Sequence, residues 1–133
     1  MKNKENDKKI TLAVDFDGVI HNYSKGWQDG SIYDKPKPGA KLALAKLVKQ
    51  GFNIVIFTTR LNPEIRDKDE AIEQTELLNK WLEKYGFLKG KHYHAITALK
   101  PKAKIYIDDR AIRFVDWKNT EKLLKDILGK AKD

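Results

Sequence analysis

Apolar runs bounded by polar residues recur along the chain, and their composition predicts buried strands. Residues 10–14 and 53–57 are rich in Val and Ile, as expected for strands of a parallel sheet. Residues 104–107 are short but also favour a strand, and residues 92–96 form a weaker candidate. Residues 114–117 are consistent with a last short edge strand.

Between these runs the apolar spacing changes to three and four residues, which predicts helices with one buried face. The first helix covers residues 39–50 and a longer one covers residues 64–85. A last helix spans about residues 119–128 and begins at Asn119 or Thr120. The residues expected on the buried face of the long helix are Ile72, Thr75, Leu78, Leu82 and Tyr85.

Strands and helices alternate over most of the chain, which argues for a parallel sheet covered by helices on both faces. We expect an α/β fold of the Rossmann-like three-layer type, with a mainly parallel central sheet. Residues 10–129 are expected to form one domain, and residues 1–9 and 130–133 read as polar tails. The segment after the first strand is rich in Gly, Asn, Ser and aromatic residues, which favours a long loop or a small hairpin.

Polar side chains directly follow each of the three clearest strands. In an open α/β sheet, ligands bind beyond the carboxyl ends of the strands. If these strands are parallel neighbours, their polar groups meet at one edge of the sheet. The groups are Asp15 and Asp17; Thr58, Thr59 and Arg60; and Asp108 and Asp109.

The expected cluster of carboxylates indicates a cation site. Carboxylates in one small space repel one another unless a cation or shared protons offset their charge. Hard oxygen ligands with room for water suit Mg²⁺. The predicted edge therefore indicates a magnesium site with a hydroxyl donor beside it.

Such an edge suits phosphoryl transfer, which requires positioning and neutralisation of charge on the phosphoryl oxygens. One carboxylate can be the nucleophile, and a second can protonate the leaving oxygen and later activate water. Asp15 and Asp17 face the same space if the chain turns sharply after Asp15, and Gly18 permits that turn.

Length and composition exclude several classes of protein. The 133 residues are about the size of one domain, which can fold without disulfides or a structural metal. The absence of cysteine excludes a disulfide scaffold, a cysteine–zinc site, an iron–sulfur cluster and a cysteine nucleophile. No apolar run is long enough to span a membrane, and residues 1–9 lack the apolar core of a secretory signal. We therefore expect a cytoplasmic protein with no membrane partner.

The chain is basic: 27 Lys and Arg against 19 Asp and Glu give a formal net charge of +8. Most of the excess is lysine. Because arginine is preferred over lysine for bidentate contacts to phosphates and bases, this surplus is typical of a solubility effect, with an anionic partner as the alternative. The arginines are Arg60, Arg66, Arg110 and Arg113.

Four segments together resemble the motifs of the haloacid dehalogenase-like (HAD) phosphohydrolase superfamily. Residues 15–19, Asp-Phe-Asp-Gly-Val after a strand, resemble the first motif, and Thr58 resembles the second. Lys100 resembles the third motif, and Asp108 with Asp109 resembles the fourth. The match keeps the order of the family and extends over most of the chain.

The resemblance implies a catalytic role for four matched residues. Asp15 would be the nucleophile and a magnesium ligand. Asp17 would be the general acid/base, with its backbone carbonyl also on the metal. Thr58 would hydrogen-bond a phosphoryl oxygen, and Lys100 would neutralise the phosphoryl group and the aspartyl-phosphate.

The last motif completes the implied metal site. Asp108 would bind magnesium directly, and Asp109 would hold a metal-bound water or Lys100. Lys102 and Lys104 lie close to Lys100 in sequence, so a neighbouring lysine is an alternative for its role.

Residues next to the motifs are candidates for substrate binding. Arg60 and Arg110 each follow a motif and could bind a second phosphate or a substrate carboxylate, or pair with a neighbouring acid. Thr59 could replace Thr58 if the strand ends one residue later. His21 is expected to be a solvated loop side chain. The flap aromatics could stack a base or sugar or pack on the body; they are Tyr23, Trp27 and Tyr33.

HAD-like enzymes commonly carry a cap domain after the first or second motif, but neither gap between the motifs is long enough for one. We expect a HAD core without a cap, with residues 19–37 as a small flap. An open site fits a bulky substrate such as a nucleic-acid end. It fits a small substrate equally well if the flap or a homo-oligomer closes it.

The expected function is that of a Mg²⁺-dependent phosphatase, a hydrolase that cleaves a phosphomonoester through an aspartyl-phosphate on Asp15. Residues 100–110 also resemble small phage and bacterial HAD-like proteins and the end of polynucleotide 3′-phosphatase domains. A phosphatase for nucleic-acid ends is therefore one alternative. A non-catalytic, phosphate-binding regulatory module is the other.

Overall fold

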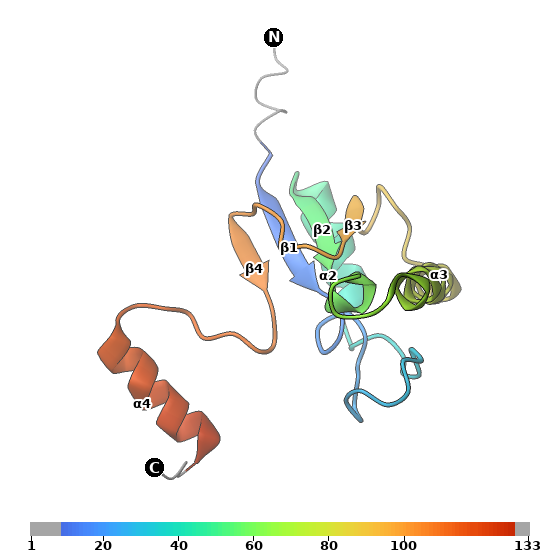
Figure 1. Cartoon of the computed structure of the whole chain (residues 1–133). Coiled ribbons are helices and arrows are strands. Elements are labelled where there is room, and N and C mark those ends of the chain that lie inside the picture. The colour runs from blue at the N-terminus through green and yellow to red at the C-terminus, as the bar shows by residue number, and fades with distance from the viewer. Residues whose placement is uncertain (1–8, 130–133) are drawn as a thin grey trace.

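The computed structural model describes residues 9–129, and the tails predicted at residues 1–9 and 130–133 lie outside them except for Lys9. Figure 1 shows the order of the elements along the chain. They are β1 (Thr11–Asp15), α2 (Ala40–Lys49), β2 (Asn53–Phe57), the short 3₁₀ helix η1 (Thr59–Leu61), α3 (Lys68–Lys84), β3 (Ala95–Thr97), β4 (Ile105–Ile107) and α4 (Trp117–Leu128).

The four strands form one parallel sheet in the order β3-β2-β1-β4. β1 lies at its centre, where Val14 pairs with Ile56 of β2 and with Ile107 of β4. The predicted fold class is confirmed: a central, all-parallel sheet flanked by helices, consistent with a Rossmann-like three-layer sandwich. Because β1, β2 and β4 are neighbours, their carboxyl ends lie at the same edge.

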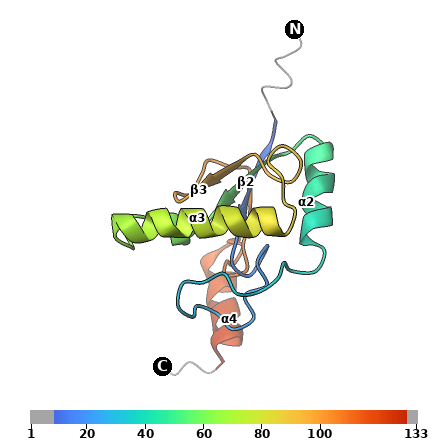
Figure 2. The ribbon, with the colours of Figure 1, turned by 90° about the vertical axis from the view of Figure 1, so that its right-hand side faces the viewer.

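The core lies between the sheet and the two helices α2 and α3. Alternate residues of β1 and β2 point to this side, and Val14, Ile54 and Ile56 are fully buried there. Figure 2 shows α3 running across the strands, with α2 beside it. The buried residues that these helices contribute are Leu44, Leu78, Trp81 and Leu82.

Helix α3 begins four residues later than predicted. Residues 62–66 instead form turns, in which the backbone N–H groups of Ile65 and Arg66 donate to the carbonyl of Asn62. The helix then starts at a capping box, because the Asp67 carboxylate accepts from the Glu70 N–H and the Glu70 side chain accepts from the Asp67 N–H. A periodic apolar pattern does not locate such a start.

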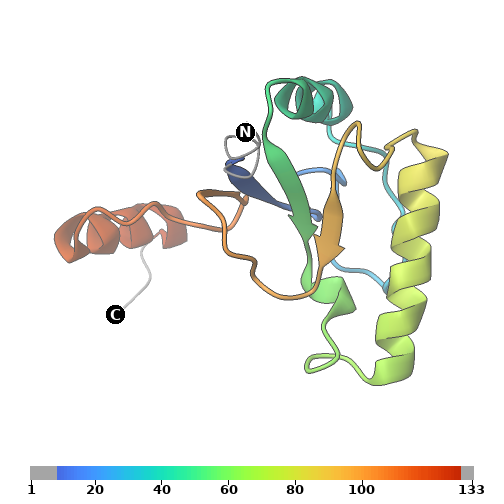
Figure 3. The ribbon, with the colours of Figure 1, turned by 90° about the horizontal axis from the view of Figure 1, so that it is seen from above.

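The edge strand predicted at residues 114–117 is wrong, because Trp117 is the first residue of α4. The predicted cap at Asn119 or Thr120 is also wrong. The Asp116 carboxylate caps the helix by accepting from the Asn119 N–H at 2.8 Å. Figure 3 shows α4 standing beyond the β4 edge, apart from the sheet, α2 and α3.

The flap (residues 19–37) is a loop without strands, held against the body at several points. The Lys37 N–H donates to the Ile20 carbonyl at 2.8 Å, which closes its base. The indole N–H of Trp81 on α3 donates to the Asp34 carbonyl at 2.9 Å. These contacts fix the flap relative to the end of β1.

Within residues 9–129, no helix is long and apolar enough to cross a membrane.

Candidate active site

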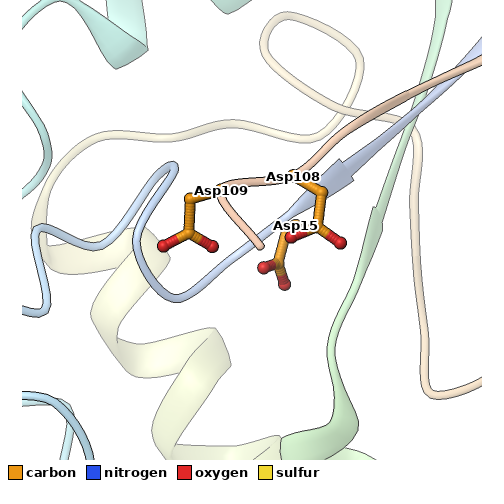
Figure 4. A group of neighbouring side chains, drawn as sticks. All are labelled: Asp15, Asp108 and Asp109. Atoms are coloured by element: carbon orange, nitrogen blue, oxygen red, sulfur yellow. The ribbon is translucent and has the colours of Figure 1, made fainter. Parts of the chain in front are cut away.

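Three carboxylates converge at the carboxyl ends of β1 and β4. Asp15 is the last residue of β1, and Asp108 and Asp109 directly follow β4. One oxygen of each lies within 4.8 Å of an oxygen of the other two. Figure 4 shows the three carboxylates around a common space. The predicted meeting of the first and last acidic motifs is therefore observed, and the three groups could hold a metal ion.

Asp15 lies in an environment that disfavours its charge. Burial raises its pKa to about 7, and the nearby charges of Asp108 and Asp109 add to this effect. The Phe16 N–H, which donates to Asp15 Oδ1 at 2.8 Å, acts in the opposite direction. A bound cation would favour the ionised form, as expected where several acids share one site.

Asp17 is held as a carboxylate by three hydrogen bonds. Arg60 donates through Nε to Oδ2 at 2.8 Å and through Nη2 to Oδ1 at 3.0 Å. His21 Nδ1 lies 2.8 Å from Oδ1. Although burial would raise its pKa, the hydrogen bonds from His21 and Arg60 outweigh it, and the pKa of Asp17 is lowered. Its side chain therefore forms the centre of a network separate from the three converging carboxylates.

His21 is buried and structural, so the prediction of a solvated loop side chain is wrong. Its Nε2 accepts from the Asp34 N–H at 3.1 Å, which leaves the ring proton on Nδ1 to be donated to Asp17. Its ring stacks on Phe16 with centroids 5.4 Å apart. His21 thus connects the flap to the first motif.

Gly18 allows the first and last motifs to approach. Its φ of 88° lies in the left-handed region that favours glycine. A Cβ at this position would also overlap the Asp109 carboxylate, with Cγ only 2.7 Å away. The glycine is therefore required by both backbone conformation and space.

Thr58 lies at the end of β2 and caps η1. Its buried Oγ1 accepts from the Arg60 N–H at 3.2 Å. This bond uses the hydroxyl as an acceptor, so its proton remains free to be donated into the pocket. Thr59 lies beside it and is exposed.

Arg60 is buried in the wall of the pocket, with its side chain only 1% exposed. Besides Asp17, its Nη1 donates to the Gly30 carbonyl at 2.9 Å and to Gln74 Oε1 at 3.0 Å. Most of its N–H groups are thus occupied. Arg60 therefore positions Asp17 and the flap. This agrees with one of the two alternatives drawn from the sequence, in which Arg60 pairs with a neighbouring acid.

These groups surround one pocket of about 210 Å³ at the edge of the sheet. It brings together most of the predicted site residues with two aromatic side chains of the flap. Its lining residues are Asp15, Asp17, Tyr23, Trp27, Phe57, Thr58, Thr59, Arg60, Arg66, Asp108 and Arg110.

Lys100 lies in a neighbouring pocket of about 550 Å³. It is exposed, with Nζ 4.7 Å from the centre of the Tyr106 ring. The two pockets share Phe57 and Asp108, and Lys104 lines the second as well. The structure therefore places Lys100 next to the site, on the far side of Asp108, and its catalytic role stays a prediction.

Three residues of this region were not predicted as part of the site: His21, Arg66 and Gln74. His21 follows the first motif by only three residues, which was a usable signal. Gln74 and Arg66 belong to no motif, and only the packing of α3 and of the turn before it against the flap places them here.

Comparison with one solved structure supports the fold. Neither a protein-family model nor a curated protein matches the chain. The crystal structure of a target from Vibrio cholerae is similar, with 25% sequence identity and a TM-score of 0.53 over 89% of this chain and 98% of the other. A chain of the Pnkp1/Rnl/Hen1 complex has 19% identity and a TM-score of 0.45, and the match covers 92% of this chain but 37% of that one.

Proposed function

We propose that this protein is a Mg²⁺-dependent phosphatase of the HAD type, which hydrolyses a phosphomonoester through an aspartyl-phosphate on Asp15. The observation that carries the proposal is the meeting of Asp15 with Asp108 and Asp109 beside the hydroxyl-lined end of β2. A cation would offset the repulsion between acidic groups this close, and the pocket beside them offers hydrogen-bond donors for an anion.

The donor set fits Mg²⁺, because it consists of carboxylate oxygens at an edge open to water. Asp15, Asp108 and Asp109 would hold the ion. When bound, it supplies neutralisation of the charge on the phosphoryl oxygens.

In the first step, a carboxylate oxygen of Asp15 attacks phosphorus, the bond to the leaving oxygen breaks, and that oxygen takes up a proton. In the second step, water attacks the aspartyl-phosphate, loses a proton to a base, and releases phosphate with the carboxylate restored. Asp17 is the proposed acid and base. The hydrogen bonds from Arg60 and His21 favour its ionised form, which is the form that the second step needs, whereas the first step needs its protonated form to supply the proton of the leaving oxygen.

Thr58 and Lys100 complete the proposed phosphoryl site. The free hydroxyl proton of Thr58 would be donated to a phosphoryl oxygen. Lys100 must move from Tyr106 toward Asp108 to reach the same group, which its exposed and flexible side chain permits.

The proposal is tested by hydrolysis of p-nitrophenyl phosphate with Mg²⁺ and with EDTA. We expect turnover that needs Mg²⁺ and falls by at least about 1,000-fold in Asp15→Asn, because the nucleophile is lost. Asp126→Asn, the same change at an exposed position of α4, is the matched control and should retain activity. Activity that survives Asp15→Asn would overturn the mechanism. Mg²⁺ and phosphate binding without any turnover would favour the non-catalytic regulatory module.

A further inference from the structure

The pocket contains a basic group that the proposed reaction does not use. Arg66 lies on its wall, in the turn before α3. Among residues 9–129, Asp17 is the carboxylate that lies within 4.0 Å of a basic side chain, and its partners are Arg60 and His21, so Arg66 has no carboxylate partner there. Its guanidinium therefore lines the pocket without an ion-pair partner among these residues.

The Arg66 side chain also contains a buried polar atom without a partner. Among the residues that the structure describes, Nε of Arg66 is the buried side-chain nitrogen or oxygen that lacks a hydrogen bond. A buried N–H of a charged group is costly when it is left unpaired. An anion that accepted from Nε would remove this cost, and the planar guanidinium is suited to bind phosphate through two N–H groups.

Trp27 of the flap holds this guanidinium in place. The Arg66 Cζ lies 4.5 Å from the centre of the Trp27 ring, and the Arg60 Cζ lies 5.0 Å from it. Stacking on an aromatic face fixes the orientation of a guanidinium without using its N–H groups. Arg66 is thus oriented by a cation–π contact that occupies none of its N–H groups.

Arg110 adds a second cation to the same pocket. It follows Asp108 and Asp109, and its backbone N–H donates to Asp108 Oδ1 at 2.9 Å. The lining of the pocket therefore contains both carboxylates that could hold a metal and two arginines, Arg66 and Arg110, that could bind an anion. The proposed reaction on one phosphoryl group assigns no role to either arginine.

We infer that Arg66, oriented by Trp27 and assisted by Arg110, binds a second phosphate group of the substrate. The inference rests on the proposed function and names its substrate class: phosphomonoesters that carry another phosphate. The second group belongs to a free bisphosphate or to the backbone of a phosphorylated nucleic-acid end, and the net charge of +8 suits either. Trp27 and Arg66 are then specificity-determining residues.

The test compares esters with one and two phosphates. The probes are a nucleoside 3′-monophosphate, the matching nucleoside 3′,5′-bisphosphate and a short 3′-phosphorylated oligonucleotide. We expect the wild type to prefer both phosphate-rich probes by kcat/KM. Arg66→Gln should raise KM for the bisphosphate by about 10- to 100-fold, the range expected for a lost charge-assisted hydrogen bond, and should do so more than for the monophosphate.

Two further variants control this comparison. Trp27→Leu should act in the same direction as Arg66→Gln, because the guanidinium loses its support. Arg113→Gln removes the same charge outside the pocket and should leave the preference unchanged. Equal kcat/KM for the one- and two-phosphate nucleosides, or a preference that survives Arg66→Gln, would overturn the inference.

A binding measurement separates this inference from the proposed function. If no ester is hydrolysed, the phosphatase proposal fails, but titration calorimetry with the bisphosphate and the monophosphate in Mg²⁺ still tests the second site. The inference predicts that the bisphosphate binds more tightly than the monophosphate, and that Arg66→Gln removes this difference in affinity. A higher kcat/KM for the 3′-phosphorylated oligonucleotide than for the nucleoside bisphosphate would identify the second phosphate as that of a nucleic-acid end. A higher kcat/KM for the nucleoside bisphosphate would identify a small bisphosphate.

Discussion

Gly18 and Asp109 lie so close together that a side chain at position 18 would displace the Asp109 carboxylate. We predict that Gly18→Ala weakens Mg²⁺ binding as well as the fold. Gly90→Ala is the matched control, because Gly90 has a similar φ of 91° but open space around its Cβ position. The control should lose about 1–2 kcal/mol of unfolding free energy from backbone strain alone.

The measurement is urea unfolding with Mg²⁺ and with EDTA. Mg²⁺ should stabilise the wild type and Gly90→Ala by similar amounts, because binding to the folded state adds to stability. Gly18→Ala should lose most of this increment. An undiminished increment in Gly18→Ala would show that Asp109 does not contribute to the metal site.

His92 gives the fold a predictable response to pH. Its Nδ1 accepts from the Leu88 N–H at 2.9 Å, and its pKa is lowered from 6.5, mainly by burial and also by Lys91 and Lys41. The folded state thus favours the neutral ring. The stability that this contributes is complete above pH 6.5 and is lost as the pH falls below it.

We predict that, between pH 7 and pH 5, the unfolding free energy of the wild type falls relative to that of His92→Asn, because the asparagine variant lacks the titrating ring. Asparagine offers an oxygen acceptor near the position of Nδ1 and does not titrate. Guanidinium unfolding at several pH values measures both slopes. Identical slopes in the two proteins would show that His92 does not contribute to the pH dependence of stability.

At the scale of elements, α3 shows how a polar residue changes the face that a helix buries. The predicted stripe included Ile72 and Thr75, but Ile72 is 52% exposed and Gln74 only 7%. The buried residues are Ala71, Gln74, Leu78, Trp81 and Leu82. Gln74 is turned inward because its Nε2 donates to the Gly30 carbonyl at 2.7 Å and its Oε1 accepts from Arg60.

We predict that Gln74→Ala destabilises the fold by about 1–3 kcal/mol, because two buried hydrogen bonds are lost. One is donated by Arg60 Nη1 to Gln74, and the other is donated by Gln74 to the Gly30 carbonyl. Glu76→Ala, two residues along the same helix and exposed, should change stability by less than about 0.5 kcal/mol. Thermal or urea unfolding compares the two. Equal, small effects would show that the flap does not depend on Gln74.

At the scale of the whole molecule, α4 is set apart from the sheet and the other helices (Figures 1 and 3). Its apolar side chains are open, with Trp117 70% and Ile127 64% exposed. A helix of 12 residues is marginal in water without tertiary packing. The body, from β1 to β4, carries the core and the candidate site.

We predict that backbone amides of α4 exchange with solvent at least about 100-fold faster than those of β1, because only local opening is needed. Hydrogen–deuterium exchange measured on the intact chain gives both rates, with β2 as an internal reference. Protection of α4 equal to that of β1 would show that the helix packs against a surface in solution.

The sequence by itself determined the parallel α/β architecture and the acidic cluster. β2 was predicted without error, and β1 and β4 to within one residue, because buried strands are short, continuous apolar runs. The convergence of Asp15 with Asp108 and Asp109 followed from the parallel order of the strands, since each acid directly follows a strand. Both are local patterns that the fold class brings together.

Only the tertiary structure decided the places of His21, Gln74, Arg66 and α4. The burial of His21 and Gln74 depends on partners that are distant in sequence, such as Asp34 for the histidine and Gly30 for the glutamine. Arg66 enters the pocket because the flap places Trp27 against it. Polar side chains carry no periodic signal, and their positions are set by hydrogen bonds and charge contacts that form only when the flap, the sheet and α3 are packed together.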